Sequence, residues 1–417
     1  MNHLNKDAFN QSSIQHGLFL LHRARQERRG DFLERAGDLV EKTIGAGIAH
    51  SRLEAPVLAP EAAIVPAALS DPGVWYRLPI PEGLSGDGSE YHIYVRRGTC
   101  DNLCVFLSGG GVAWNAFTAA HPVTYGKMAS GRPNYYWNNL RPFTQAMNIH
   151  VGITSNTRAN PFHDWNFIVI TYSTGDFHVG DGDFAYEDTR GEEEVLHFRG
   201  HRNFRAAMDR AAKLFPSCQK LLIAGNSAGA FAVPALTPEI VENYYPDAAD
   251  VTLLSDSGQL LYHKWRETAR DIWKAEKRFF EVLHSDNITL DWYEALTVRF
   301  GDKLRYLYAS STHDFLLSAY YNDVTNKVYE SDAEVQDAYF QQLKEMVRSL
   351  RQMAPGISFY FNRWKNPVTM GGTIHTAVRE PYFFAAEPGQ PSMAKWLIDA
   401  VHGATADVGD DLLARAH

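Results

Sequence analysis

The sequence has few cysteines and no long hydrophobic run, and both absences exclude classes of protein. Its three cysteines are too few, and odd in number, for a disulfide framework, and no second Cys or His pair completes a zinc pattern. We expect free thiols, buried or half-buried, at Cys100, Cys104 and Cys218. No segment reaches the roughly 18 apolar residues of a membrane helix, so we expect no membrane span.

An excess of positive charge is also absent. Lysine and arginine total 40 against 49 aspartates and glutamates, so the formal net charge is −9. Binding to nucleic-acid phosphates needs a basic surface, and we therefore expect no nucleic-acid partner. The apolar run Gly17–Leu21 is too short for the core of a signal peptide. This favours a cytoplasmic location, with secretion as the alternative.

Composition divides the chain into two parts. Residues 1–73 have a helical N-terminal stretch followed by a segment rich in Pro and Ala, which is typical of a linker or an extended strap. Residues 74–417 carry short apolar runs that alternate with helical stretches, a pattern typical of one α/β domain. We find no internal repeat.

The apolar runs predict the strands of this domain. Several are continuously apolar rather than alternating, which indicates parallel strands covered on both faces. Helical stretches are expected at 201–214, 228–244 and 333–352. The fold expected is therefore a mostly parallel, doubly wound sheet, with strands at 92–95, 103–107, 167–172, 221–224, 251–254, 304–308 and 357–361.

Two connections are too long to be plain turns, at about 112–166 and 259–301. Both are rich in aromatic residues, and both leave the carboxyl ends of predicted strands, where open α/β sheets bind ligands. One interpretation is a cap of helices and aromatic side chains over an active site. The alternative is that these aromatics form a satellite core.

Gly225-Asn226-Ser227-Ala228-Gly229 is a complete G-x-S-x-G pattern. In the α/β-hydrolase fold this pattern forms a sharp turn from strand to helix that exposes the serine hydroxyl. An apolar run precedes it here and an Ala-rich helical run follows. We predict that Ser227 is a nucleophile, against the alternative of a glycine-rich turn without chemistry.

A serine nucleophile requires backbone N–H groups that stabilise an oxyanion. One is expected from Ala228, the residue after the nucleophile. Ser108-Gly109-Gly110-Gly111-Val112 directly follows the predicted strand 103–107, the position of the glycine-rich loop of lipases and esterases. We therefore predict an oxyanion hole from the N–H groups of Gly111, Val112 and Ala228.

The acid and the histidine of such a triad follow the serine along the chain. His375 lies in a Gly-rich loop after the last predicted strand and is the favoured base. Asp314 follows the preceding predicted strand and is the favoured acid, ahead of Asp256 and then of Asp323. Other histidines, such as His284 in the second long connection, are expected on solvated or packed faces.

The stretch 172–183 is dense in Asp and His. A metal site is one interpretation, with Asp176, His178, Asp181 and Asp183 as ligands. The spacing does not fit a calcium loop, because the glycine and the final glutamate are misplaced. We favour a polar loop that lines the site or supports the sheet, and we predict no metal and no cofactor.

Short motifs follow one another along the chain at Leu107–Gly111, Tyr172–Asp176, Gly225–Gly229, Asp256-Ser257-Gly258 and His375. In this order they resemble the pectin acetylesterase / Notum family. The resemblance covers about residues 74–400 and implies an α/β-hydrolase fold, carboxylic ester hydrolysis and a triad of Ser227, Asp314 and His375. The family usually has Glu before the glycine turn and Trp and Cys after it, where this chain has Ser108 and Val112-Ala113.

We therefore expect a serine esterase that hydrolyses an acyl or acetyl ester through an acyl-enzyme intermediate. Its substrate would be a small-molecule or polymer-borne ester. The alternatives are a polyester or thioester hydrolase with the same triad, and a ligand-binding protein on a hydrolase fold without catalysis.

Overall fold

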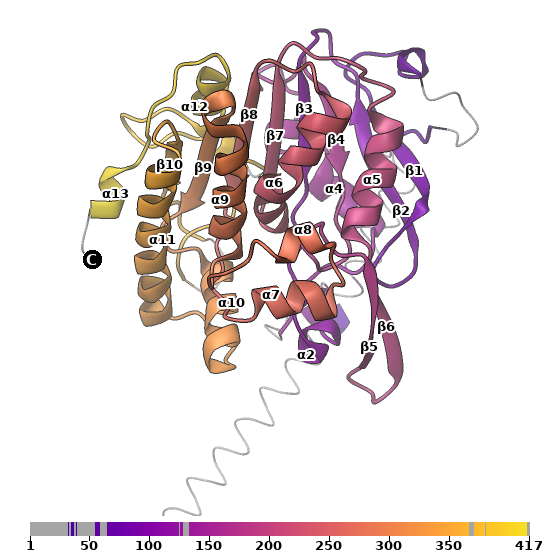
Figure 1. The fold of residues 1–417 in the computed structure, drawn as a ribbon, viewed down its shortest axis with the longest axis vertical. Coiled ribbons are helices and arrows are strands. Elements are labelled where there is room, and N and C mark those ends of the chain that lie inside the picture. Colours follow the sequence, from indigo (N-terminus) through magenta and orange to yellow (C-terminus); the bar gives the residue numbers. More distant parts are fainter. Residues whose placement is uncertain are drawn as a thin grey trace, which may run out of the picture.

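The computed structural model describes residues 55–58, 65–124, 126–127, 133–366, 371–379 and 381–414, together with Phe32, Arg35, Ala36 and Leu39. Its main feature is an eight-stranded sheet of order β1-β2-β4-β3-β7-β8-β9-β10 (Figure 1). β1 and β2 pair antiparallel, as do β2 and β4, and all the other neighbours are parallel. The strands are β1 (Trp75–Leu84), β2 (Glu90–Arg96), β3 (Leu103–Leu107), β4 (Asn166–Ile170), β7 (Leu221–Asn226), β8 (Val251–Asp256), β9 (Arg305–Ser311) and β10 (Ser358–Asn362).

The continuous apolar runs form the centre of this sheet. Along β3, Leu103, Val105 and Leu107 face one core cluster, and Cys104 and Phe106 face the other. All five are buried, because successive side chains of a strand point to opposite faces and helices or loops cover both. The expected mostly parallel α/β-hydrolase fold is confirmed.

One face of the sheet is covered by helices that follow or precede its strands. In Figure 1 these are the helices in front of the sheet, α5, α6, α9 and α11. The opposite face is covered by α12 and by the irregular segments around Ile153, Phe162 and Phe383. The helices are α2 (Ala116–Ala119), α4 (Pro142–Asn148), α5 (Gly200–Ala211), α6 (Ala228–Glu239), α7 (Trp265–Glu267), α8 (Lys277–Phe280), α9 (Ile288–Phe300), α10 (Phe315–Asn326), α11 (Ala333–Met353), α12 (Met393–Val401) and α13 (Asp411–Ala414).

The three helical stretches expected from the sequence correspond to α5, to α6 with its π-helical extension η3 (Ile240–Tyr244), and to α11. All seven predicted strands are present within a few residues. Short helical turns fill the connections: η1 (Pro66–Ala68), η2 (Gly152–Thr154), η4 (Thr268–Ile272), η5 (Gly301–Lys303) and η6 (Pro381–Phe383).

Three strands were not predicted. β1 contains Pro79 and Pro81, which suppress a strand prediction but are tolerated at the edge of a sheet, where β1 lies. The other two form the hairpin of β5 (Gly182–Glu187) and β6 (Glu193–Phe198), whose sequences are charged and largely solvent-facing. This hairpin projects from the lower edge of the molecule in Figure 1.

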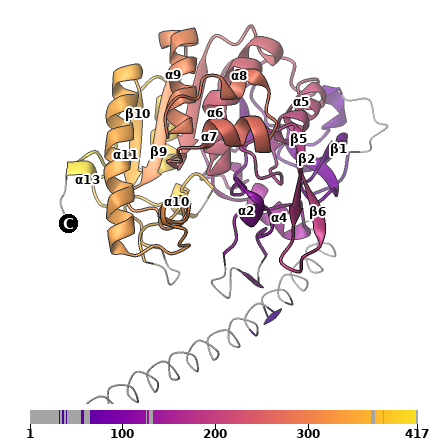
Figure 2. The ribbon, with the colours of Figure 1, turned by 60° about the horizontal axis from the view of Figure 1, so that its bottom comes forward.

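The two long connections meet beyond the carboxyl ends of the strands, the end that comes forward in Figure 2. The Nε1–H of Trp273, from the second, donates to the carbonyl of Ala113, in the first, at 2.7 Å. The rings of Trp114 and Tyr262 lie 6.5 Å apart. These side chains are buried in the same core cluster as the sheet, so the aromatics extend the core at the end of the sheet where Ser227 lies.

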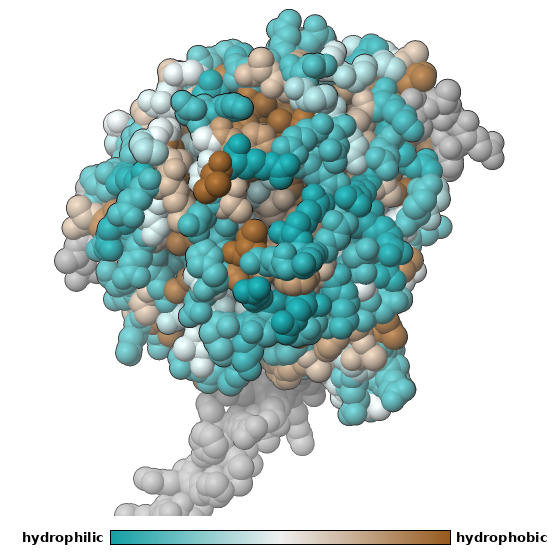
Figure 3. Space-filling model, in the orientation of Figure 1, coloured by the Kyte–Doolittle hydropathy of each residue, from teal (hydrophilic) through white to brown (hydrophobic). Residues whose placement is uncertain are grey.

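On the face seen in Figure 3, hydrophobic residues form small separate patches among hydrophilic ones. Val298 on α9 is the most exposed of the large hydrophobics among the described residues, at 84%. No helix in the described ranges combines the length and apolarity needed to cross a bilayer. Cys104 is buried, Cys100 and Cys218 are half-buried, and all three are free thiols.

Candidate active site

Ser227 lies at the turn between β7 and α6. Its backbone has φ 52° and ψ −126°, a strained conformation for a residue with a side chain. Gly229 allows this turn, because a methyl group at that position would overlap the carbonyl of Leu107 in the neighbouring strand. The N–H of Ser227 donates to the carbonyl of Asp256 at 2.9 Å, which ties the turn to the end of β8. The G-x-S-x-G pattern thus forms the strained turn that its spacing predicts.

His375 connects the serine to one aspartate. Its Nε2 lies 2.7 Å from the Oγ of Ser227, and its Nδ1 lies 2.7 Å from Oδ2 of Asp314. With the proton on Nδ1 directed at the carboxylate, Nε2 is placed to accept the serine proton. The three side chains come from the β7–α6 turn, the β9–α10 turn and the segment after β10, which meet at the carboxyl edge of the sheet.

The carboxylate of Asp314 is fixed by its place at the start of α10. It is fully buried, and its Oδ1 accepts the N–H groups of Leu316 and Leu317, both at 3.0 Å. A helix N-cap of this kind satisfies N–H groups that lack partners within the helix. Because Oδ1 caps the helix, Oδ2 remains directed at His375.

The other two candidate acids have different partners. Oδ2 of Asp256 accepts the N–H groups of Ala377 and Val378, both at 2.8 Å. Oδ2 of Asp323 accepts the hydroxyl of Tyr135 at 3.2 Å. Of the three aspartates that the sequence left open, Asp314 is therefore the one that the structure places on the imidazole.

The glycine turn after β3 lies directly beside Ser227. A methyl group at Gly109 would lie 2.6 Å from Cβ of Ser227, so only glycine allows this approach. The expected donor Val112 is wrong, because its N–H already donates to the carbonyl of Tyr135 at 2.8 Å. The N–H groups of Gly110, Gly111 and Ala228 donate to no protein acceptor in the described ranges. The candidate oxyanion donors thus shift by one residue, to Gly110 and Gly111, with Ala228 retained.

Buried polar side chains hold the glycine turn in place. The N–H of Gly109 donates to Oδ1 of Asn226 at 3.1 Å, and the ring Nε2 of His178 lies 2.9 Å from the carbonyl of Ser108. Burial lowers the pKa of His178 to about 4, so the ring is neutral and Nε2 carries the proton that this contact needs. The roles of Asn226 and His178 as supports of the turn were not predicted, although both residues belong to motifs that stand out in the sequence.

The Asp- and His-rich stretch 172–183 does not converge on one point. Asp176 is buried and accepts the N–H of Gly200 at 2.8 Å and the hydroxyl of Thr174 at 2.7 Å. Asp181 pairs with Arg202, and Asp183 pairs with His197 and Arg199. With His178 on the glycine turn, each side chain supports a different part of the structure, as the polar-loop interpretation predicts.

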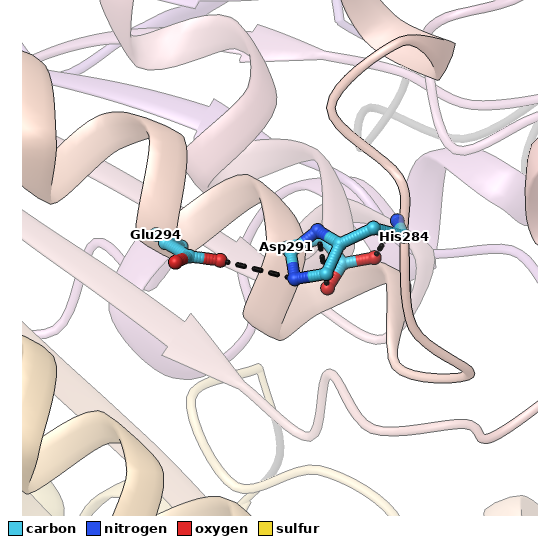
Figure 4. Close-up of side chains that lie close together, drawn as sticks. All are labelled: His284, Asp291 and Glu294. Atoms are coloured by element: carbon cyan, nitrogen blue, oxygen red, sulfur yellow. Dashed lines mark hydrogen bonds and ion pairs between the residues drawn. The ribbon is translucent and has the colours of Figure 1, made fainter.

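A second histidine–carboxylate cluster lies in the second long connection. In His284, Asp291 and Glu294, one ligand-type atom of each lies within 4.8 Å of the others (Figure 4). The carboxylates face opposite nitrogens of the ring: Asp291 lies 3.6 Å from Nδ1 and Glu294 3.3 Å from Nε2. Two carboxylates on two different ring nitrogens suit a protonated imidazole better than one shared metal ion.

The environment of His284 agrees with that assignment. A hydrogen bond to the carbonyl of Val282 and the charge of Asp291 raise the pKa of His284. Asp291 already accepts the N–H groups of His284 and Ser285, at 2.8 and 2.9 Å, and the Ser285 hydroxyl at 2.7 Å. This cluster therefore stabilises the loop before α9.

Comparison with known proteins places the chain in a family. No curated protein matches the chain significantly. A family model described as pectinacetylesterase matches residues 82–346, which is more than half of the chain and includes Ser227 and Asp314. The eight-stranded, mostly parallel sheet agrees with the α/β-hydrolase fold of that family. The chain therefore belongs to the pectinacetylesterase family of carboxylic ester hydrolases.

Proposed function

We propose that this protein is a serine esterase that removes acetyl groups from an ester substrate through an acyl-enzyme intermediate. The observation that carries the proposal is the arrangement of His375, whose two nitrogens each lie 2.7 Å from an oxygen, one of Ser227 and one of Asp314. This is the geometry that general-base activation of a serine requires.

In the proposed mechanism, Nε2 of His375 takes the proton of Ser227 as Oγ attacks the ester carbonyl. The negative charge that develops on the carbonyl oxygen is stabilised by the N–H groups of Gly110, Gly111 and Ala228. His375 then gives its proton to the leaving alcohol, and the acetyl group remains on Ser227. Water, activated by the same imidazole, releases acetate and restores the serine.

The acetyl ester is favoured over the thioester and polyester alternatives by the family, whose description names an acetylesterase of pectin. Trp137 and Tyr172 also lie against Gly110, since a methyl group there would lie 3.3 and 2.6 Å from their rings. Two aromatic rings therefore lie beside a proposed oxyanion donor.

A fluorophosphonate probe tests the nucleophile. We expect the wild type to be labelled at Ser227 and the Ser227→Ala variant to be unlabelled, with loss of p-nitrophenyl acetate hydrolysis. Equal labelling of both proteins would show that another residue is the nucleophile. Acetate release from acetylated pectin, compared with p-nitrophenyl esters of increasing chain length and an acetyl thioester, tests the substrate.

A further inference from the structure

Asp256 is bonded to the turn that carries Ser227 and to the segment that follows His375, but it is not the aspartate that lies on the imidazole. It is the last residue of β8, beside the end of β7, and it is buried. Its backbone carbonyl accepts the N–H of Ser227 at 2.9 Å. Its Oδ2 accepts the N–H groups of Ala377 and Val378, both at 2.8 Å. One residue is therefore bonded to the nucleophile's backbone and to the segment just after His375.

Residues 371–379, which carry His375, form no helix or strand, so their position depends on such bonds. Before His375, the N–H of Thr373 donates to the carbonyl of His313 at 2.8 Å, and Thr373 forms a bridge with Asp314. This anchors the near side of the loop to the turn that carries the proposed acid. After His375, the far side is held by Asp256 and by the N–H of Ile153, which donates to the carbonyl of Val378 at 2.9 Å.

The carboxylate of Asp256 is well suited to this role. Burial raises the pKa of this carboxylate to about 6, although the two backbone N–H groups act in the opposite direction and lower it. Its Oδ1 also accepts the hydroxyl of Ser257 at 3.2 Å. Two buried N–H groups directed at one oxygen would lose their acceptor if the side chain were removed, and each such loss is costly.

We propose that Asp256 is a positioning residue that holds the far side of the His375 loop in register with Ser227. This inference rests on the proposed function, because it assigns a role around the same imidazole. It also separates Asp256 from Asp314: the first needs an oxygen that accepts hydrogen bonds, and the second needs a carboxylate that fixes the tautomer of His375. The two roles respond differently to an amide.

The decisive comparison uses Asp256→Asn, Asp256→Ala and Asp314→Asn, assayed with p-nitrophenyl acetate and with the fluorophosphonate probe. Asparagine keeps an oxygen for the two N–H groups, so Asp256→Asn should retain kcat within about tenfold. Asp256→Ala should lose about 10²-fold in kcat with little change in KM, the size expected when a base is slightly misplaced. Asp314→Asn should lose about 10⁴-fold despite the same chemical change.

Asp291→Ala is the matched control. Asp291 is also buried and also accepts two consecutive backbone N–H groups and a neighbouring serine hydroxyl, but it lies in the second long connection. A general loss of stability would affect both alanine variants, whereas a positioning role affects kcat only in Asp256→Ala. Equal kcat in Asp256→Ala and the wild type would overturn the proposal. So would an Asp256→Asn variant as inactive as Asp314→Asn, since Asp256 would then act through its charge.

The downfield proton NMR signal of the His375 Nδ1–H gives a readout that does not depend on activity. The wild type and Asp256→Asn should show this signal at acidic pH, and Asp256→Ala should broaden or lose it. If the wild type shows the signal but neither hydrolyses esters nor reacts with the probe, the proposed function fails while the positioning role is still measured. If Asp256→Ala shows an unchanged signal, or fails to fold while Asp256→Asn loses the signal, the positioning role is wrong.

Discussion

Two histidines of this protein, His375 and His284, each lie beside a buried aspartate. The difference between the surroundings of the two rings shows which arrangement suits an imidazole to act as a base. Among the described residues, the carboxylate of Asp314 lies on Nδ1 of His375 and the hydroxyl of Ser227 lies on Nε2. His284 has a carboxylate near each nitrogen, and its side chain is 61% exposed. A carboxylate on Nδ1 fixes the neutral tautomer in which Nε2 can accept a proton, whereas carboxylates near both nitrogens favour the charged ring.

The two aspartates also differ in how their oxygens are used. Asp314 divides its oxygens, with one capping α10 and the other facing His375. Asp291 uses both oxygens to accept hydrogen bonds from the backbone and the serine side chain of the loop. Nδ1 of His284 lies 3.6 Å from Oδ1 of Asp291, beyond hydrogen-bond distance. The first arrangement leaves a carboxylate oxygen for chemistry, and the second uses both oxygens for structure.

The largest expected effect comes from the same substitution made at both clusters. Asp314→Asn should lower kcat about 10⁴-fold, because the amide favours the wrong tautomer of His375. Asp291→Asn should leave kcat within about twofold, because His284 takes no part in the proposed chemistry. Steady-state hydrolysis of p-nitrophenyl acetate measures both. Comparable losses of kcat in the two variants would show that the two histidine–aspartate clusters do not differ in their role in catalysis.

A third histidine, His178, is buried, and we expect it to affect the stability of the protein in acid. The pKa of His178 is lowered to about 4 by burial, so the unfolded chain binds a proton more readily than the folded one. Its neutral form is fully stabilising above about pH 6.5, and this contribution falls as the pH drops toward 4, by on the order of 3 kcal/mol.

Urea unfolding of the wild type and of His178→Gln, between pH 7 and pH 4, measures this contribution. Glutamine does not titrate, so the variant should be less stable at pH 7 and should have a shallower loss of stability toward pH 4. Parallel curves for the two proteins would show that His178 is not the titrating group.

Removal of the structural aspartate should affect stability and not chemistry. Asp291→Ala leaves the N–H groups of His284 and Ser285 and a serine hydroxyl without their acceptor, so we expect a loss of about 1–3 kcal/mol in the free energy of unfolding. Chemical denaturation at pH 7 measures the loss, and kcat below the transition should be unchanged. A drop in kcat without loss of stability would mean that this loop reaches the proposed site.

The smallest effect is expected at the exposed carboxylate, Glu294. The pKa of His284 is raised, so its ion pairs contribute below the unfolded pKa and are lost as the pH rises through the folded pKa. Glu294→Gln should therefore cost about 0.5 kcal/mol at pH 5 and nothing measurable at pH 9, as expected for a solvent-exposed pair. Denaturation at the two pH values measures this, and an equal cost at both would argue against a charged His284. Adding Zn²⁺ or a chelator should not change the unfolding midpoint, and a zinc-dependent rise would instead indicate a metal site.

Much of the fold followed from local chemistry. Six of the seven predicted strands were readable because parallel strands covered on both faces are apolar throughout, as in Leu103–Leu107. β1 was missed because its prolines are compatible only with an edge position, which is a property of the assembled sheet. The hairpin β5–β6 was missed because its charged residues resemble a loop and lie outside the main sheet.

The candidate site divides in the same way. Ser227 was predictable because a strained strand-to-helix turn needs small residues at fixed spacing, and that requirement is visible in five consecutive residues. Chain order ranked Asp314 first among three aspartates but left Asp256 open, because Asp256 also ends a strand and only packing brings Asp314 to His375. Val112 was misassigned as a donor because Tyr135, more than twenty positions along the chain, occupies its N–H.

The sequence by itself determined seven of the strands, the strained turn at Ser227 and the position of His375 after the last strand, because each depends on residues that are near one another in the chain. The tertiary structure decided which carboxylate meets His375, which N–H groups remain for an oxyanion, and that Asp256 ties the two sides of the site together. These depend on where hydrogen bonds between distant segments are made, since a buried donor or acceptor takes the partner that packing brings to it.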